Sequence, residues 1–166
     1  FAFMFLMIVM GLNQGMQPIV GYNYGARRIN RVQKAFRLTV FFATLVTTFA
    51  FLLAQLKPEW IVRVFTTDEE LIRLSVYGMR ISVMVFPLIG AQMVITNFFQ
   101  SIGMAKKSVF LSLTRQVIVL IPCLLIMPKL FGIAGIWMSM PVSDTVSALV
   151  SIAMIYVQLG KFNAKQ

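Results

Sequence analysis

The chain has 166 residues, of which 59% are hydrophobic and 12% charged, whereas an average soluble domain has about 45–50% apolar and about 25% charged residues. So few charges cannot cover a soluble surface, and the composition therefore excludes a soluble enzyme and a disordered segment and indicates an integral membrane protein. The net charge of +10 does not point to nucleic acid, because the basic residues form short clusters between long apolar runs, as in the loops of membrane proteins.

The composition also excludes several kinds of chemistry. A single cysteine, Cys123, cannot form an intramolecular disulfide or a cysteine metal cluster, and the sequence has no histidine. The phosphate-binding pattern G-x-x-x-x-G-K-[ST] is absent, which argues against transport driven by ATP. We therefore expect no enzymatic activity, no metal and no cofactor.

Long runs with at most one charge predict the fold. A helix that spans a membrane needs about 20 predominantly apolar residues. The sequence predicts an all-α integral membrane protein, one domain over 1–166, with about five spans at 1–22, 37–56, 75–99, 107–128 and 132–157. Because the chain opens at Phe1, already inside an apolar run, we expect it to be a piece of a longer protein.

The second half of the first span is rich in polar residues, glycine and proline. Asn13, Gln14 and Gln17 are candidates for a substrate or ion path, since polar groups inside a bilayer are costly and often functional. Pro18 removes a backbone donor and is expected to kink the helix. Two interpretations are open: a flexible segment that faces a cavity, or close helix packing through small residues.

The charges of the loops predict the orientation. Nine basic residues would lie on one side of the membrane and four on the other, and the richer side is expected to be cytoplasmic. The nine are Arg27, Arg28, Arg31, Lys34, Arg37, Lys106, Lys107, Lys161 and Lys165. The C-terminus is therefore predicted to lie in the cytoplasm.

The third span is predicted to follow a capped helix start and to bend. Thr67 and Glu70 have the spacing of a capping box, with the hydroxyl at the N-cap. Pro87 and Gly90 predict a bend. Gln92 and Asn97 are further path candidates that either face a cavity or form hydrogen bonds between helices.

Two charges lie deep in the fourth and fifth spans. At a rise of about 1.5 Å per residue, Arg115 is roughly 12 Å from the cytoplasmic end of the fourth span. Asp144 is roughly 18 Å from the outer end of the fifth span. Antiparallel neighbours would bring the two charges to one level, where they can form an ion pair. The pair is either a structural link or a site for coupling ions or substrate charge.

Four stretches resemble the multidrug and toxic compound extrusion (MATE) transporters. Residues 14–28 (QGMQPIVGYNYGARR), continuing to Val32, resemble the end of the family's eighth helix, and residues 65–72 (FTTDEELI) its outer loop between helices nine and ten. Residues 100–107 (QSIGMAKK) are similar to the end of helix ten. Residues 131–144 (FGIAGIWMSMPVSD) are similar to the start and middle of helix twelve. All four stretches occur in the family's order and spacing.

The resemblance implies helices eight to twelve of a twelve-helix transporter with two lobes, that is, most of the C-terminal lobe. It implies export of cationic and amphiphilic drugs in exchange for Na⁺ or H⁺ by alternating access. The implied partners are the N-terminal lobe and membrane lipid, and the implied location is the inner membrane of a bacterial cell. The third span has no carboxylate from residue 76 to 100, whereas in the NorM-like branch a carboxylate of helix ten contributes to a cation site. Of the acids that the family has in this lobe, Asp144 alone is available here.

Three other functions stay open. A lipid-linked oligosaccharide flippase of the same superfamily would carry more charges in its cavity than Arg115 and Asp144. A membrane scaffold subunit would show no substrate-dependent change. A membrane enzyme is disfavoured by the lack of histidine and of paired acids. Half a transporter cannot enclose the cavity, so we expect that this chain alone does not transport.

Overall fold

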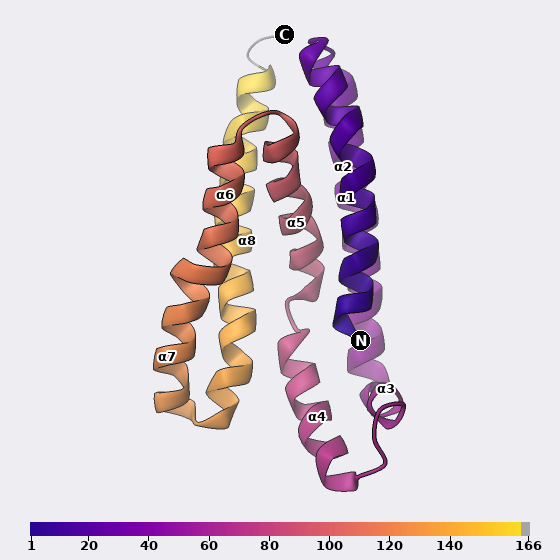
Figure 1. Ribbon diagram of the computed structural model, residues 1–166, viewed down its shortest axis with the longest axis vertical. Helices are drawn as coiled ribbons and strands as arrows, with labels where there is room; N and C mark the ends of the chain where they lie inside the picture. Colours follow the sequence, from indigo (N-terminus) through magenta and orange to yellow (C-terminus); the bar gives the residue numbers. More distant parts are fainter. Residues whose placement is uncertain (164–166) are drawn as a thin grey trace.

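The computed structural model describes residues 1–163, and over them the chain is a bundle of helices without strands (Figure 1). The helices are α1 (Ala2–Gly25), α2 (Ile29–Leu56), α3 (Pro58–Arg63), α4 (Glu69–Ser82), α5 (Phe86–Ser101), α6 (Ala105–Leu113), the π-helix η1 (Thr114–Val119), α7 (Leu120–Phe131) and α8 (Ile133–Asn163). The long helices run along the long axis of the molecule.

Four stretches of helix are long and apolar enough to cross a membrane: Ala2–Gly25, Ile29–Leu56, Ala105–Phe131 and Ile133–Phe162. Helices α4 and α5 are separated by a break and bent by 51°, and they give a fifth span if the pair is counted as one. The predicted all-α membrane fold class is therefore confirmed. The second helix begins at Ile29, well before the predicted span, so that the basic residues up to Arg37 extend it beyond its apolar part.

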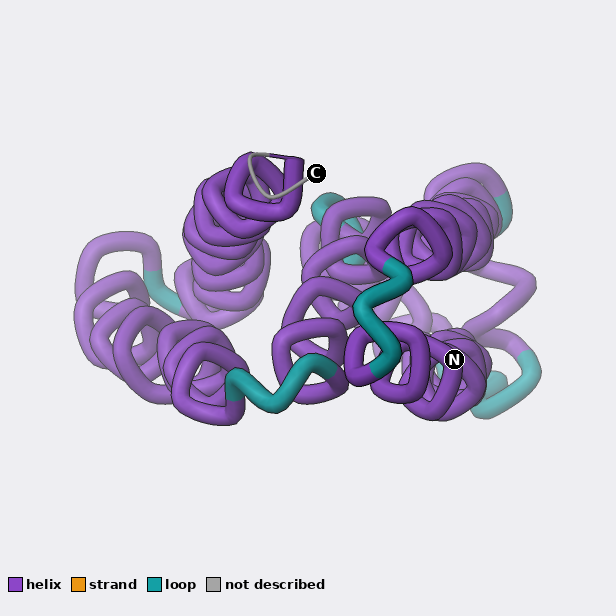
Figure 2. The backbone as a smooth tube through the Cα atoms, turned by 90° about the horizontal axis from the view of Figure 1, so that it is seen from above, coloured by secondary structure: helices purple, strands orange, loops and turns teal. Residues whose placement is uncertain are grey.

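Helix α5 occupies the centre of the bundle and packs against α1, α2, α6 and α8 (Figure 2). Its buried aromatic residues Phe98 and Phe99 belong to the main hydrophobic core, where the Phe98 ring lies 4.6 Å from that of Phe36 in α2. This arrangement follows from the sequence of α5, in which apolar residues recur on more than one face.

Large apolar side chains cover much of the outside of the bundle. No residue of α7 is buried, and its Leu125 and Leu130 side chains are more than half exposed. Such a surface is suited to contact with the hydrocarbon region of a bilayer, which is itself apolar. The backbone N–H and C=O groups form hydrogen bonds within the helices and so need no water there.

The basic turns gather at one end of the molecule. The α1–α2 turn, the α5–α6 turn and the end of α8 lie together at the top of Figure 1, and α3, the start of α4 and the α7–α8 turn lie at the bottom. The grouping used for the orientation thus corresponds to one end of the bundle, although Lys165 lies outside the described residues.

Two local predictions need correction. The N-cap of α4 is Asp68 and not Thr67, because the Asp68 Oδ1 atom accepts hydrogen bonds from the backbone N–H groups of Glu70 and Leu71. The predicted bend of the third span is present, but it lies at residues 83–85, before Phe86 and Pro87, which form the first turn of α5. Proline fits there because the first backbone N–H groups of a helix have no partner within it.

Gly90 does not form part of the bend, and it has a different role. It lies inside α5 against α2, where an added Cβ atom would stand 2.7 Å from the carbonyl oxygen of Ala43 and 2.6 Å from Thr47 Oγ1. The missing side chain therefore permits the close approach of α2 and α5, as small residues do between membrane helices.

Candidate functional site

An ion pair joins the fourth and fifth spans. Arg115 Nε lies 2.7 Å from Asp144 Oδ1, with 28% and 9% of the two side chains exposed. The neighbouring Ser143 donates a hydrogen bond from Oγ to the carbonyl oxygen of Arg115 at 2.6 Å. The two interactions fix η1 to α8 and bring together the two deep charges of the sequence.

Arg115 belongs to the π-helical segment Thr114–Val119, which lies between α6 and α7. A π-helix bonds residue i to residue i+5, holds more residues per turn than an α-helix, and often occurs at functional sites. Thr114 Oγ1 donates to the carbonyl oxygen of Phe110 at 2.8 Å within the same stretch. The local widening of the helix is thus located at the one charged residue between Lys107 and Lys129 of this span.

A small pocket of about 180 Å³ opens beside Arg115, between α5, α6 and η1. The lining residues are Gln92, Met93, Thr96, Asn97, Leu111, Ser112, Arg115 and Gln116. Gln92 is 3% exposed, and its side-chain Oε1 atom has no hydrogen-bond partner. A buried acceptor without a partner is uncommon in native structures and calls for an explanation such as a bound solute or water.

Three of the predicted path residues, Gln92, Asn97 and Arg115, therefore line one pocket, and Asp144 is joined to it through Arg115. The pocket wall offers amide and hydroxyl groups with an ion pair behind them. Such a wall can donate and accept hydrogen bonds to a polar or charged solute while its own net charge stays near zero.

The polar residues of α1 lie elsewhere. Asn13 is buried, and neither its Oδ1 nor its Nδ2 atom has a hydrogen-bond partner. Gln14 and Gln17 are exposed on the outside of α1. The helix continues unbroken through Pro18, and the predicted kink and the path role of these residues stay predictions.

Some residues of the pocket wall, and several buried residues of α8 behind it, were not predicted from the sequence. Thr96 follows Gln92 by four residues, and Gln116 follows Ser112 by four, which was a usable signal because residues four apart share a helix face. Four buried serines on one face of α8 were missed in the same way: Ser139, Ser143, Ser147 and Ser151. Three of them donate to backbone carbonyl oxygens, which satisfies their hydroxyl groups without charge.

The described residues contain no group of three or more His, Cys, Asp or Glu side chains that could hold a metal ion. Asp144 is the one carboxylate away from the ends of the spans, because Glu59, Asp68, Glu69 and Glu70 lie in or beside the short α3 and at the start of α4. The residues that line the pocket beside Arg115 thus include amides, hydroxyl groups and one guanidinium, and no carboxylate.

Comparison with known proteins gives a consistent result. The family described as MatE matches residues 1–125. The "Multidrug export protein MepA" of Staphylococcus aureus (strain MSSA476) is 25% identical over 156 residues, which are 91% of this chain and 33% of that protein. The protein of the same name from Staphylococcus haemolyticus (strain JCSC1435) is 23% identical over 150 residues, or 90% of this chain and 33% of that protein.

Solved structures agree in sequence and in fold. A structure of the "MATE multidrug transporter DinF-BH", solved as a complex, is 43% identical, covers 92% of this chain and 34% of its own, and superposes with a TM-score of 0.86. A structure described as "MATE in the straight conformation" has a TM-score of 0.89 at 16% identity, over 98% of this chain and 37% of its own, which shows the shared fold. The chain spans about a third of the length of the relatives it matches.

Proposed function

The chain belongs to the MatE family of multidrug transporters, and from this we propose that it forms most of one lobe of a secondary active efflux antiporter. The observation that carries the proposal is the family match over residues 1–125, together with 43% identity to a solved multidrug transporter. The complete transporter would export cationic and amphiphilic compounds in exchange for Na⁺ or H⁺.

The pocket beside Arg115 supports a direct part in this transport. It lies between central α5 and the span that contains η1, and its amide groups include a buried oxygen without a partner. Gln92 and Asn97 would bind substrate, ion or water during the cycle. The Arg115–Asp144 pair would hold the wall in place, because its hydrogen bonds join η1 to α8.

The proposed partner of this lobe is the N-terminal lobe of the same transporter. Alternating access in transporters built from repeats takes place by movement of one repeat against the other around a site near the middle of the bilayer. The lobe alone provides one wall of that site. We therefore propose that the 166 residues expressed alone do not transport.

The proposed orientation places the basic end in the cytoplasm of a bacterial cell. The α1–α2 turn, which carries Arg27, and the start of α6, which carries Lys107, lie at the same end as Lys161. This grouping supports the orientation, because basic residues of short loops stay on the cytoplasmic side.

Efflux measurements on pocket variants of the full-length transporter test the role of the pocket. Gln92→Ala and Asn97→Ala each remove an amide from the pocket, and we expect a several-fold lower efflux of a cationic dye, on the scale of one lost hydrogen bond to a charged group. Gln100→Ala is the matched control, because Gln100 is an exposed amide of the same helix outside the pocket.

Each outcome has a distinct meaning. Loss of efflux in the two pocket variants at normal membrane levels, with the control unchanged, supports the proposal. Equal efflux in all three variants contradicts a role for the pocket. Failure of the unmodified transporter to export any cationic dye contradicts the antiporter assignment and favours the flippase or scaffold alternatives.

A further inference from the structure

A second, larger pocket lies at the basic end of the bundle, away from the Arg115 site. Its volume is about 900 Å³. The pocket is formed by the end of α1, the start of α2, the start of α6 and the last turns of α8, and the residues that line it include Tyr24, Arg27, Lys107, Gln158, Lys161 and Phe162. None of these residues was singled out as a path candidate in the sequence.

The pocket has an apolar floor and a basic rim. Phe162 is 5% exposed and its ring lies 6.0 Å from that of Tyr24 and 6.4 Å from that of Phe98, so the floor is part of the packed core. The rim holds three cationic side chains from three elements: Arg27, Lys107 and Lys161. Apolar contact next to concentrated positive charge suits a ligand that is both anionic and amphiphilic.

The Lys107 side chain is held in place. Its Nζ atom donates a hydrogen bond to Gln158 Oε1 at 2.9 Å and lies 5.1 Å from the centre of the Phe99 ring. Gln158 itself is 3% exposed. A lysine fixed by a buried amide and an aromatic face presents its charge at a defined position, unlike a freely solvated surface lysine.

No acidic side chain neutralises this rim. The sequence has five acidic residues: four lie at the opposite end of the bundle, in or beside α3 and α4, and the fifth, Asp144, is bound to Arg115. The positive charge of the pocket is therefore without an acidic side chain as its counterpart in this sequence.

The backbone at Arg27 carries a second and independent sign of function. The backbone of Arg27 has φ +57°, in the left-handed region that residues other than glycine rarely adopt. The turn has the hydrogen bonds of a Schellman motif, from Arg27 N–H to the Tyr24 carbonyl oxygen and from Arg28 N–H to that of Asn23. Glycine is the usual residue at this position.

The neighbouring turn at the same end shows the usual solution. At the end of α5, Gly103 has φ +78°, and the N–H groups of Gly103 and Met104 bond to the carbonyl oxygens of Gln100 and Phe99 in the same pattern. Arg27 thus occupies a position at which glycine would adopt the same backbone conformation with less strain. A strained residue that persists without a structural need points to a function of its side chain.

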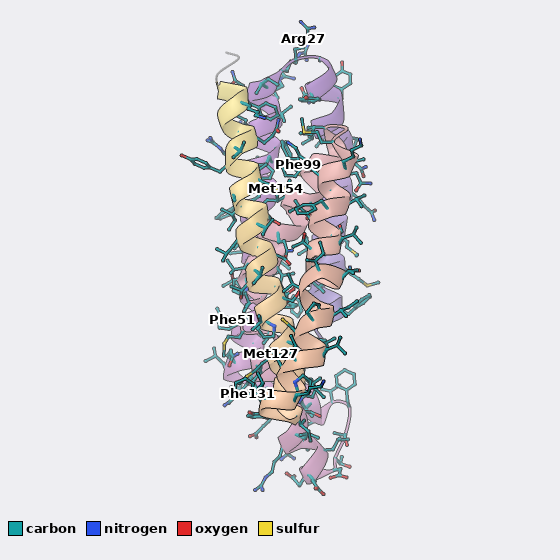
Figure 3. The ribbon with its side chains drawn as sticks, turned by 90° about the vertical axis from the view of Figure 1, so that its left-hand side faces the viewer. Arg27, Phe51, Phe99, Met127, Phe131 and Met154 are labelled. Carbon is teal, nitrogen blue, oxygen red and sulfur yellow. The ribbon has the colours of Figure 1, made fainter. Side chains whose placement is uncertain are left out.

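We propose that this pocket binds the phosphate headgroup of an anionic phospholipid, with Arg27, Lys107 and Lys161 around the phosphate and the first part of the acyl chains against Tyr24 and Phe162. The site is at the end of the spans, where headgroups lie, and Figure 3 shows Arg27 at the tip of the molecule above Phe99. Guanidinium and ammonium groups are the side chains that bind phosphate best, and basic pockets between membrane helices suit lipid headgroups. The site requires a membrane-spanning chain but not the proposed antiport.

Native mass spectrometry of the protein in a neutral detergent tests the proposal with phosphatidylglycerol as the probe. We expect the unmodified protein to retain phosphatidylglycerol and not phosphatidylcholine. Replacing Arg27, Lys107 and Lys161 by Gln together is expected to lower the retained fraction roughly tenfold or more, because each basic residue near an anionic surface contributes severalfold. The matched control replaces Arg28, Arg37 and Lys106 by Gln, which removes the same charge at the same end outside the pocket.

Several outcomes would overturn the proposal. They are equal loss in the pocket and control triples, equal retention of phosphatidylcholine, and displacement of the lipid by millimolar inorganic phosphate, which would indicate a site for free phosphate. If the pocket triple does not yield folded protein, Lys107→Gln against Lys106→Gln makes the same comparison with single changes.

Arg27→Gly separates a ligand-binding role from a structural one. Glycine relieves the left-handed backbone, so the variant is expected to melt about 2 °C higher in lipid-free detergent. The same variant is expected to retain several times less phosphatidylglycerol. A variant that is less stable and still binds the lipid normally would show that Arg27 serves the turn and not the headgroup.

Discussion

Breaking the Arg115–Asp144 pair gives the sharpest test of how the site is held together. Removing one partner of a fully buried pair costs about 3–5 kcal/mol, and exposed pairs contribute about 0–1 kcal/mol. The Asp144 side chain is 9% exposed and the Arg115 side chain 28%, so the pair lies between these limits. We expect Asp144→Asn to lower the free energy of unfolding by about 2 kcal/mol and Arg115→Gln by about 3 kcal/mol, because Arg115→Gln leaves the more buried partner alone.

The double variant distinguishes a pair from two separate residues. Two neutral amides can share a hydrogen bond, so we expect a loss of about 2–3 kcal/mol instead of the sum of about 5 kcal/mol, a coupling of about 2–3 kcal/mol. The assay is unfolding by a denaturing detergent in mixed micelles, followed by tryptophan fluorescence. Arg80→Gln is the control, since Arg80 is exposed near the end of its helix, and should change stability by less than about 0.5 kcal/mol. Losses that add within about 0.5 kcal/mol would refute the pairing.

Further predictions concern helix contacts and caps, measured by the same unfolding assay. Gly90→Ala pushes a Cβ atom against Ala43 and Thr47 of α2 and should cost about 1–3 kcal/mol, whereas Gly11→Ala, which meets nothing within 4 Å, should stabilise α1 by up to about 1 kcal/mol; equal effects would contradict the close α2–α5 contact. Asp68→Ala should cost about 1 kcal/mol and Thr67→Ala less than about 0.5 kcal/mol, and the reverse order would restore Thr67 as the cap. Ser143→Ala should cost about 1 kcal/mol through the lost bond to the Arg115 carbonyl oxygen, and no loss would remove this link between η1 and α8.

The sequence was informative where one general constraint, such as the thickness of the bilayer or the geometry of antiparallel helices, decides the outcome. Length and apolarity predicted the helical membrane fold, because a bilayer allows few solutions for the backbone. The meeting of Arg115 and Asp144 could be anticipated, because two antiparallel helices joined by a short turn place equal depths side by side. Gln92 and Asn97 could be nominated as polar residues in an apolar run, and the structure places both on the same pocket.

Local geometry was less predictable for identifiable reasons. Thr67 and Asp68 are both good N-cap residues, and the choice depends on where the chain leaves the preceding turn. Gly90 was assigned to a bend because glycine weakens helices, but its close contact with α2 depends on helix packing that a single helix does not reveal. The π-helix at Arg115 and the left-handed backbone at Arg27 have no sequence pattern that marks them.

The measurement that tests the central claim most directly is dye efflux from cells that express the full-length transporter, with the Na⁺ and pH gradients varied separately, beside cells that express only these 166 residues. The account predicts efflux by the full-length protein that collapses with one of the two gradients, and no efflux by the 166 residues alone. Efflux that is indifferent to both gradients, or efflux by the 166 residues alone, would contradict the assignment of this chain as one lobe of an ion-coupled antiporter.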